Sequence, residues 1–211
     1  MSLTLEQDTP VVLDGVSWET YLSFGEDAGP GTRMTYDNGR LEIMPPISIG
    51  HDKRKSLLAD LTTQYLLVRD IPYDRVGQTT LKRQELLKGT DPDDGFYIRP
   101  DEAGMPLDVD DLDLAIHPPP NLVIEVDRTS PSIPREPILA ALGVSELWRW
   151  DFKGDMLSLH RLRDDMTGYG DIQASGLLPD LDVVALAEHV RLGRSCRQSE
   201  VVARWRNFLT G

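Results

Sequence analysis

Apolar and polar residues along this chain follow helical spacing in some segments and strand-like runs in others. The clearest helix covers residues 50–69, where Leu57, Leu58, Leu61, Tyr65 and Val68 recur at helical spacing and form one apolar stripe. Capping serine, first-turn proline and terminal glycine are further helix signals. These signals predict helices at 17–23 and 134–143. The C-terminal tail is expected to carry two more, at 182–192 and 197–209.

Strands are expected where short apolar runs lie between turn residues. Two hairpins are predicted, one across Asp37-Asn38-Gly39 and closed by Pro45-Pro46, the other across Lys153-Gly154-Asp155. The expected strands cover residues 32–36, 40–44, 73–83, 95–99, 121–127, 146–152 and 156–162. Residues 1–15 carry neither pattern and are expected to form a loose arm. The sequence therefore predicts an N-terminal arm, 1–15, and a single α/β (α+β) domain over 16–211.

The composition is that of an ordinary globular protein. The chain has 211 residues, of which 40% are hydrophobic and 27% charged, enough for a sizeable core. No apolar run approaches the length of a membrane span, so no membrane association is expected. Cys196 is the only cysteine, which excludes an intrachain disulfide and favours the cytoplasm.

The formal net charge of −13 argues against a sequence-independent polyanion binder, whose affinity depends on many Lys and Arg contacts. It does not exclude a nuclease, because acids around a metal site add to the negative total. Much of the excess lies in one stretch that we interpret as a solvated loop, with Asp101, Glu102, Asp108, Asp110, Asp111 and Asp113.

The strand predicted at 121–127 carries the most informative chemistry. It ends in Glu125 and Asp127, which share one face of an extended chain, and Asp93 stands at the start of another predicted strand. If the two strands are neighbours, Asp93 and Glu125 can bind one cation. Oxygen-only ligands favour magnesium or manganese over zinc. The alternative is that these are strand-end acids that point into water.

Several other kinds of site are excluded or disfavoured. The glycines form no phosphate-cradling pattern, no Gly-x-Ser-x-Gly elbow is present, and the four histidines lack zinc-ligand spacing. Cys196 has no His or Cys at ligand spacing and is interpreted as inert.

Six segments in order carry a family resemblance. The chain resembles the "putative restriction endonuclease" family, formerly a domain of unknown function, within the PD-(D/E)XK nuclease superfamily. The matching segments are 36–46 (YDNGRLEIMPP) with His51, 77–83 (GQTTLKR), 92–98 (PDDGFYI), 118–127 (PPPNLVIEVD), 129–132 (TSPS) and 140–151 (AALGVSELWRWD).

This resemblance implies a restriction-endonuclease-like mixed sheet flanked by helices, with helices at the C-terminus. It implies that Asp93 and Glu125 bind a divalent cation, Mg or Mn. Glu42 matches a glutamate often placed in the same site, and His51 matches a histidine at the start of the first long helix.

The sequence departs from the superfamily pattern at the lysine. The position two residues after the glutamate is Asp127, and the helix position that carries a lysine in this family is Arg135. A lysine can shed a proton when its pKa is depressed, whereas arginine stays protonated and can only clamp a phosphate. Lys82, Lys53 and Lys55 are possible replacements.

Four other features have both a functional and a structural interpretation. His51 could relay a proton or simply bond nearby backbone, and Glu42 could be a third metal carboxylate or the solvent side of a hairpin. Lys53, Arg54 and Lys55 could contact a nucleic-acid backbone or form a solvated helix face. Trp148 and Trp150 are expected in the core.

The leading functional hypothesis is a divalent-metal-dependent endonuclease that acts on DNA. Asp93 and Glu125 would bind the metal, Glu42 and Asp127 are further carboxylate candidates, and Arg135 or a lysine would contact the phosphate. The second hypothesis is a non-catalytic relative that serves as a binding or dimerisation module, with a homodimer as the assembly. A third, hydrolysis of a small phosphoester, suits the negative charge but has no motif.

Overall fold

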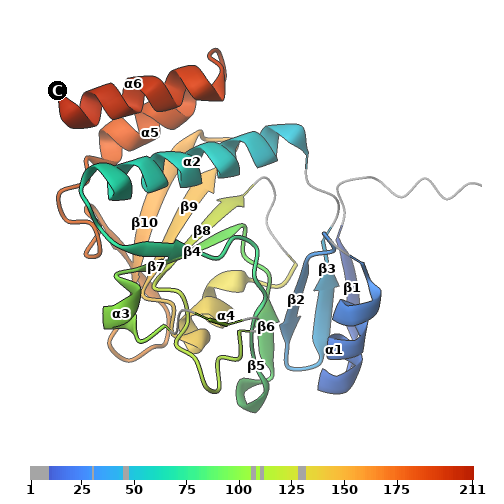
Figure 1. Ribbon diagram of the computed structural model, residues 1–211. Helices are drawn as coiled ribbons and strands as arrows, with labels where there is room; N and C mark the ends of the chain where they lie inside the picture. The colour runs from blue at the N-terminus through green and yellow to red at the C-terminus, as the bar shows by residue number, and fades with distance from the viewer. Residues whose placement is uncertain (1–9, 30, 45–47, 106–107, 110–111, 128–131) are drawn as a thin grey trace, which may run out of the picture.

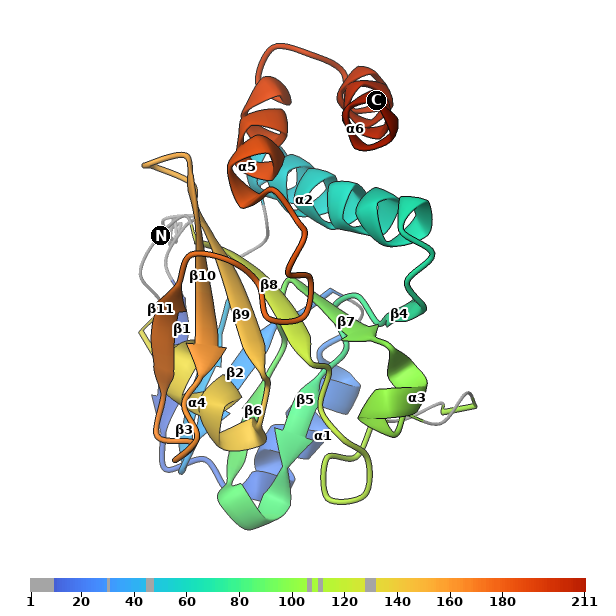
Figure 2. The same cartoon turned by 90° about the vertical axis from the view of Figure 1, so that its left-hand side faces the viewer.

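The computed structural model describes residues 10–29, 31–44, 48–105, 108–109, 112–127 and 132–211 (Figure 1). Several features named above lie outside these residues: residues 1–9 of the arm, Pro45-Pro46, Asp110 and Asp111, and 129–131 of the fifth motif. Within the described part, the chain forms two sheets with helices against them, which confirms the mixed α/β fold class (Figures 1 and 2).

The first sheet is antiparallel throughout and has five strands. Its core is the predicted hairpin, whose Asn38-Gly39 turn takes positive φ at both residues, as a tight hairpin turn requires. In sheet order the strands are β1 (Val11–Asp14), β3 (Arg40–Ile43), β2 (Met34–Asp37), β6 (Lys88–Thr90) and β5 (Leu81–Arg83). Helix α1 (Trp18–Asp27) packs Trp18 and Tyr21 on this sheet and is capped by Ser17, as predicted.

The second sheet has six strands and is mixed. Its only parallel pair among the described strands is β8–β9, whose crossover contains helix α4 (Arg135–Leu142). In sheet order the strands are β11 (Tyr169–Ile172), β10 (Met156–Leu162), β9 (Glu146–Asp151), β8 (Leu122–Asp127), β7 (Asp94–Ile98) and β4 (Tyr73–Arg75).

Three helices cover one face of the six-stranded sheet (Figure 2). They are α2 (Ile49–Val68), α5 (Val183–Leu192) and α6 (Gln198–Thr210), all close to their predicted bounds. The stripe predicted on α2 is buried here except for Val68, which is partly exposed, and Trp148 and Trp150 are fully buried beneath it, as predicted. None of the described helices combines the length and the apolar character that crossing a membrane requires.

The opposite face of this sheet packs against α4 and the five-stranded sheet. Ile138, Leu139 and Leu142 of α4 join Val123 and Leu147 in a second apolar cluster, to which Leu81 of β5 belongs. Because side chains alternate along β8, Glu125 shares this inner face with Val123. Glu125 therefore projects into the space between the two sheets, toward α4.

Three expectations about secondary structure are wrong. Residues 73–83 are not one strand: β4 and β5 belong to different sheets, because the chain turns at Gly77, where φ is +61°. The arm expected over 1–15 is not loose at 11–14, which form β1 by pairing with β3. Strands β6 and β11 were not predicted, since each is short and has little apolar alternation.

The remaining short elements connect strands within one sheet. A single 3-10 turn, Gln84–Leu86, joins β5 to β6, and α3 (Pro100–Ala103) follows β7. The acidic stretch after β7 is exposed at Asp101, Asp108 and Asp113, in agreement with its interpretation as a solvated segment.

Candidate active site

The two acids singled out by the sequence lie opposite each other on adjacent strands. In the antiparallel β7–β8 pair, Asp94 is aligned with Ile124, so Asp93, one residue earlier, faces Glu125. The Asp93 carboxylate accepts a hydrogen bond from the Val126 N–H at 2.7 Å. Both acids are buried, Asp93 at 1% and Glu125 at 3% exposure, so the alternative interpretation, that they are strand-end acids pointing into water, is wrong.

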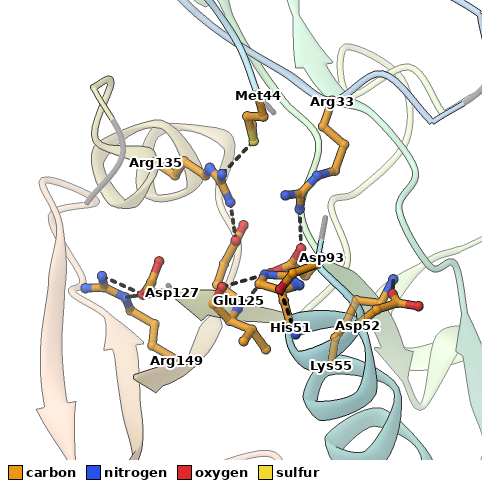
Figure 3. A network of polar contacts seen from close by, with 12 residues as sticks. Arg33, Met44, His51, Asp52, Lys55, Asp93, Glu125, Asp127, Arg135 and Arg149 are labelled. Atoms are coloured by element: carbon orange, nitrogen blue, oxygen red, sulfur yellow. Dashed lines mark hydrogen bonds and ion pairs between the residues drawn. The ribbon is translucent and has the colours of Figure 1, made fainter. Parts of the chain in front are cut away.

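A guanidinium group and an imidazole ring stabilise the ionised form of Asp93. The Arg33 guanidinium forms an ion pair with one carboxylate oxygen, and His51 Nε2 lies 3.3 Å from the other (Figure 3). Burial would raise the pKa of Asp93, but the hydrogen bond from His51 and the charge of Arg33 outweigh it and lower the pKa. Asp93 is therefore ionised at neutral pH.

His51 joins the start of α2 to the end of β8. Ser48 caps the helix by accepting a hydrogen bond from the His51 N–H at 3.3 Å, which fixes the backbone of the first turn. The ring nitrogen Nε2 donates to the Val126 carbonyl oxygen at 2.7 Å, and Nδ1 is buried without a partner among the described residues. The observed role of His51 is to position Asp93 and the strand end.

Glu125 is paired with Arg135, the first residue of α4 (Figure 3). The same guanidinium contacts Met44 Sδ at 2.7 Å. Burial raises the pKa of Glu125; Arg135 opposes this shift, whereas the nearby Asp93 and Asp127 carboxylates add to it. The pKa of Glu125 is therefore raised mainly because the group is buried, although Arg135 lies beside it.

Glu42 is an anchor for the segment that leads into α4. Its two carboxylate oxygens accept hydrogen bonds from the backbone N–H groups of Ser132, at 2.8 Å, and Ile133, at 3.3 Å. Its exposure is 1%, so the interpretation of Glu42 as the solvent side of a hairpin is wrong. By holding residues 132–133, Glu42 positions Arg135 two residues later.

Asp127 is at the edge of the cluster. It forms an ion pair with Arg149 at 2.8 Å, and Arg149 also reaches Glu136 at 3.4 Å. These side chains are about a quarter to two fifths exposed. The Asp127–Arg149 pair is therefore more accessible to solvent than the Glu125–Arg135 pair. Asp127 does share a face with Glu125, as predicted.

The comparisons with known proteins bear on this site. The Uma2 family, described as "putative restriction endonuclease", matches residues 18–197. The chain belongs to the Uma2 family. No curated protein matches it. A solved structure, described as a putative nuclease belonging to DUF820 from Anabaena variabilis, aligns with 82% of this chain and 90% of its own at 13% identity, with a TM-score of 0.49.

The lysines proposed as substitutes in this Uma2 protein differ in their surroundings. Lys55 pairs with Asp52 at 3.0 Å on the surface of α2, and Lys53 is exposed. Lys82 lies on β5, in the other sheet from Asp93 and Glu125. The basic groups seen on the two acids are instead Arg33 and Arg135.

The donor set of the Uma2 site is compatible with a hard cation. Glu125 Oε1 is buried and has no hydrogen-bond partner among the described residues, although the other oxygen is bound to Arg135. Magnesium is often held by one or two carboxylates, its other ligands being water and substrate oxygens. In the described part of the chain, no cluster of three or more His, Cys, Asp or Glu side chains could enclose a metal.

Sequence reasoning missed two residues of this Uma2 site. Arg33 precedes β2 and is separated from Asp93 by 60 positions, so no local pattern connects them. Asp91 is a further buried acid whose carboxylate accepts a hydrogen bond from the Met34 N–H at 2.7 Å, and burial raises its pKa. The only available signal for Asp91 was its place two residues before Asp93.

We expect Arg135→Met to destabilise the protein strongly. The substitution removes the positive partner of a buried carboxyl group, and breaking a buried ion pair in this way typically costs about 3–5 kcal/mol. The matched control is Arg149→Met, which breaks a half-exposed pair and should cost less than about 1 kcal/mol. Urea unfolding of both variants and the wild type measures these losses. Equal losses would contradict the special role of the Arg135 pair.

Glu125 should also make stability depend on pH. Because its folded-state pKa is raised, the folded protein retains this proton to higher pH than the unfolded chain, and stability is lost as pH rises. The free energy of unfolding of Glu125→Gln, relative to wild type, should therefore increase between about pH 5 and about pH 9. Urea titrations in EDTA across this range test it, with Glu85→Gln as an exposed control expected to show no trend.

Proposed function

We propose that this Uma2-family protein is a divalent-metal-dependent endonuclease that hydrolyses phosphodiester bonds of DNA. The observation that carries the proposal is the buried, cross-strand pair of Asp93 and Glu125, with one carboxylate oxygen left without a described partner. Two acids are costly to bury together, so their presence between the two sheets favours a use that requires negative charge. The family assignment supports a nuclease-like activity.

Asp93 and Glu125 would hold the cation, Glu125 through Oε1. When bound, a magnesium or manganese ion polarises a phosphoryl oxygen and lowers the pKa of water. His51 would keep Asp93 ionised and oriented, because its Nε2 lies beside that carboxylate and is bonded to the next strand's backbone. Glu42 would act through the segment that leads to α4, and Asp127 through the charge that it adds near Glu125.

The two arginines would orient the phosphate. Arg33 and Arg135 each have a buried Nε–H that lacks a hydrogen-bond partner among the described residues. A guanidinium presents several donors in a fixed plane that matches phosphate oxygens, so each arginine can hold a carboxylate and still donate to a substrate. Neither can act as a base near neutral pH, because arginine remains protonated.

A second function is favoured by one observation, the ion pairs that already neutralise both acids. If Arg33 and Arg135 take the place of the cation permanently, the domain is a non-catalytic module that binds a partner or forms a homodimer. The two functions differ in whether added metal produces cleavage.

Cleavage assays with isosteric variants test the proposed function. With manganese, the wild type should nick or cut duplex DNA, whereas Asp93→Asn and Glu125→Gln should lose at least about a hundredfold in rate, as expected when charge stabilisation of the transition state is removed. Asp14→Asn, an exposed acid of β1, is the control and should cleave normally. Equal cleavage by Asp93→Asn and wild type would reveal a contaminating nuclease.

The Arg135→Lys variant separates the roles that a cationic residue could have here. We expect lysine to be faster, by about tenfold or more, because a lysine beside the buried acids can exchange a proton and arginine cannot. Single-turnover rates on a mixed-sequence duplex at saturating manganese provide the measurement. A slower lysine variant would show that the phosphate contact of Arg135 matters more than proton exchange at this position, and absence of cleavage in both forms would support the non-catalytic module.

A further inference from the structure

Basic residues from distant parts of the sequence meet at the N-terminal end of α2. Three lie on α2 itself, one in the turn between β9 and β10, and three at the junction of α5 and α6. We call this group the basic face; its members are Lys53, Arg54, Lys55, Lys153, Arg191, Arg194 and Arg197. They comprise seven of the 22 Lys and Arg residues of the chain.

Asp155, in the β9–β10 turn, fixes three of these arginines. Its carboxylate pairs with Arg54 at 3.5 Å and with Arg194 at 3.0 Å, and its backbone carbonyl accepts from Arg191 Nε at 2.8 Å. The carboxylate is only 15% exposed, whereas the Arg194 side chain is 64% exposed. Asp155 therefore orders three guanidinium groups and offsets the charge of one.

Other contacts make the three segments one surface. Gln198, at the start of α6, donates to the Lys53 carbonyl oxygen at 3.4 Å, and the Arg54 guanidinium lies 4.1 Å above the Phe152 ring. In both ribbon views, α5 and α6 lie beside α2 (Figures 1 and 2).

The charge of this surface has the opposite sign to that of the whole protein. The acids on the same segments are Asp52, Asp151, Asp155 and Glu200, so the seven basic residues leave a surplus of three positive charges in a chain whose net charge is −13. Lys53, Lys153 and Arg197 are exposed. Such segregation costs electrostatic repulsion unless the surface meets an anion.

The basic face also borders the candidate active site. His51, which contacts Asp93, is two residues before Lys53 on the same helix, and Lys55 projects from α2 beside it (Figure 3). An extended polyanion that lies along the basic face would therefore lie close to the start of α2, where His51 contacts Asp93.

We propose that the basic face binds the phosphate backbone of duplex DNA and directs one phosphodiester toward the acid pair, an inference that rests on the proposed function. Fixed guanidinium groups and mobile lysines are the groups that neutralise backbone phosphates, and binding releases condensed counterions. The contacts are sequence-independent, so the basic face supplies affinity and orientation, not base recognition.

A pair of charge reversals tests this proposal in the full chain. Lys53→Glu/Lys153→Glu alters two exposed residues of the basic face, and Arg40→Glu/Arg163→Glu makes the same charge change elsewhere. Arg40 is at the turn end of β3, and Arg163 lies beyond the end of β10 that is remote from Asp155. The measurement is the Kd for a labelled 20-base-pair duplex in EDTA, as a function of sodium chloride concentration.

The basic-face variant should bind at least about tenfold more weakly than the control variant, and its salt slope should fall by about two. Equal binding by the two variants, or no salt-dependent binding by the wild type, would overturn the proposal. Tighter binding of the wild type to duplex RNA, or to vesicles with anionic lipid, would also overturn the assignment to DNA.

Together with the manganese cleavage assay, this binding experiment separates the inference from the proposed function. Binding measured in EDTA requires neither metal nor catalysis. Cleavage by the wild type combined with equal DNA binding by both variants would overturn the basic face and leave the nuclease proposal standing. Salt-dependent binding that the basic-face variant loses, without cleavage by any form, would support the basic face and overturn the nuclease.

Discussion

Two carboxylates buried side by side persist in a folded protein only if positive groups offset their charge. Here Arg33 offsets the charge of Asp93, His51 Nε2 lies 3.3 Å from the same carboxylate, and Arg135 offsets the charge of Glu125. Arg33 directly precedes β2, His51 lies on α2 and Arg135 lies on α4. The contacts of the two acids therefore link both sheets and two helices. The position of α4 in turn depends on Glu42, which holds the backbone immediately before it.

The surrounding groups stabilise the ionised form of Asp93 more effectively than that of Glu125. The groups around Asp93 lower its pKa despite complete burial, whereas the pKa of Glu125 is raised because Arg135 must counter burial and two further carboxylates. A divalent cation bound beside Glu125 would favour its ionised form and so lower its pKa. For this reason an arginine-paired site and a metal site are compatible: the arginines hold the acids in place, and the cation would supply the charge that they do not.

Charge is also distributed unevenly outside this site. A strongly acidic chain concentrates a third of its basic residues at the N-terminal end of α2, and a single aspartate in a turn contacts three of the arginines. The average charge of the chain is therefore a poor guide to its local potential. What an anionic substrate meets depends on which segments the fold brings together.

The sequence by itself determined both hairpins, the acids Asp93 and Glu125, and the helices α1, α2, α4, α5 and α6, because periodicity, turn residues and a polar end to an apolar strand are local signals. The four-residue helix α3 was not predicted. It did not determine the split of 73–83 between two sheets or the strands at 11–14, 88–90 and 169–172, whose formation depends on pairing partners far along the chain. Glu42 was found from the sequence, but its role as an anchor was not. The roles of Arg33 and of the junction of α5 and α6 emerged only from the tertiary structure. The ion pairs Arg33–Asp93 and Arg194–Asp155 join residues far apart in the chain, and such pairs leave no pattern in a single sequence.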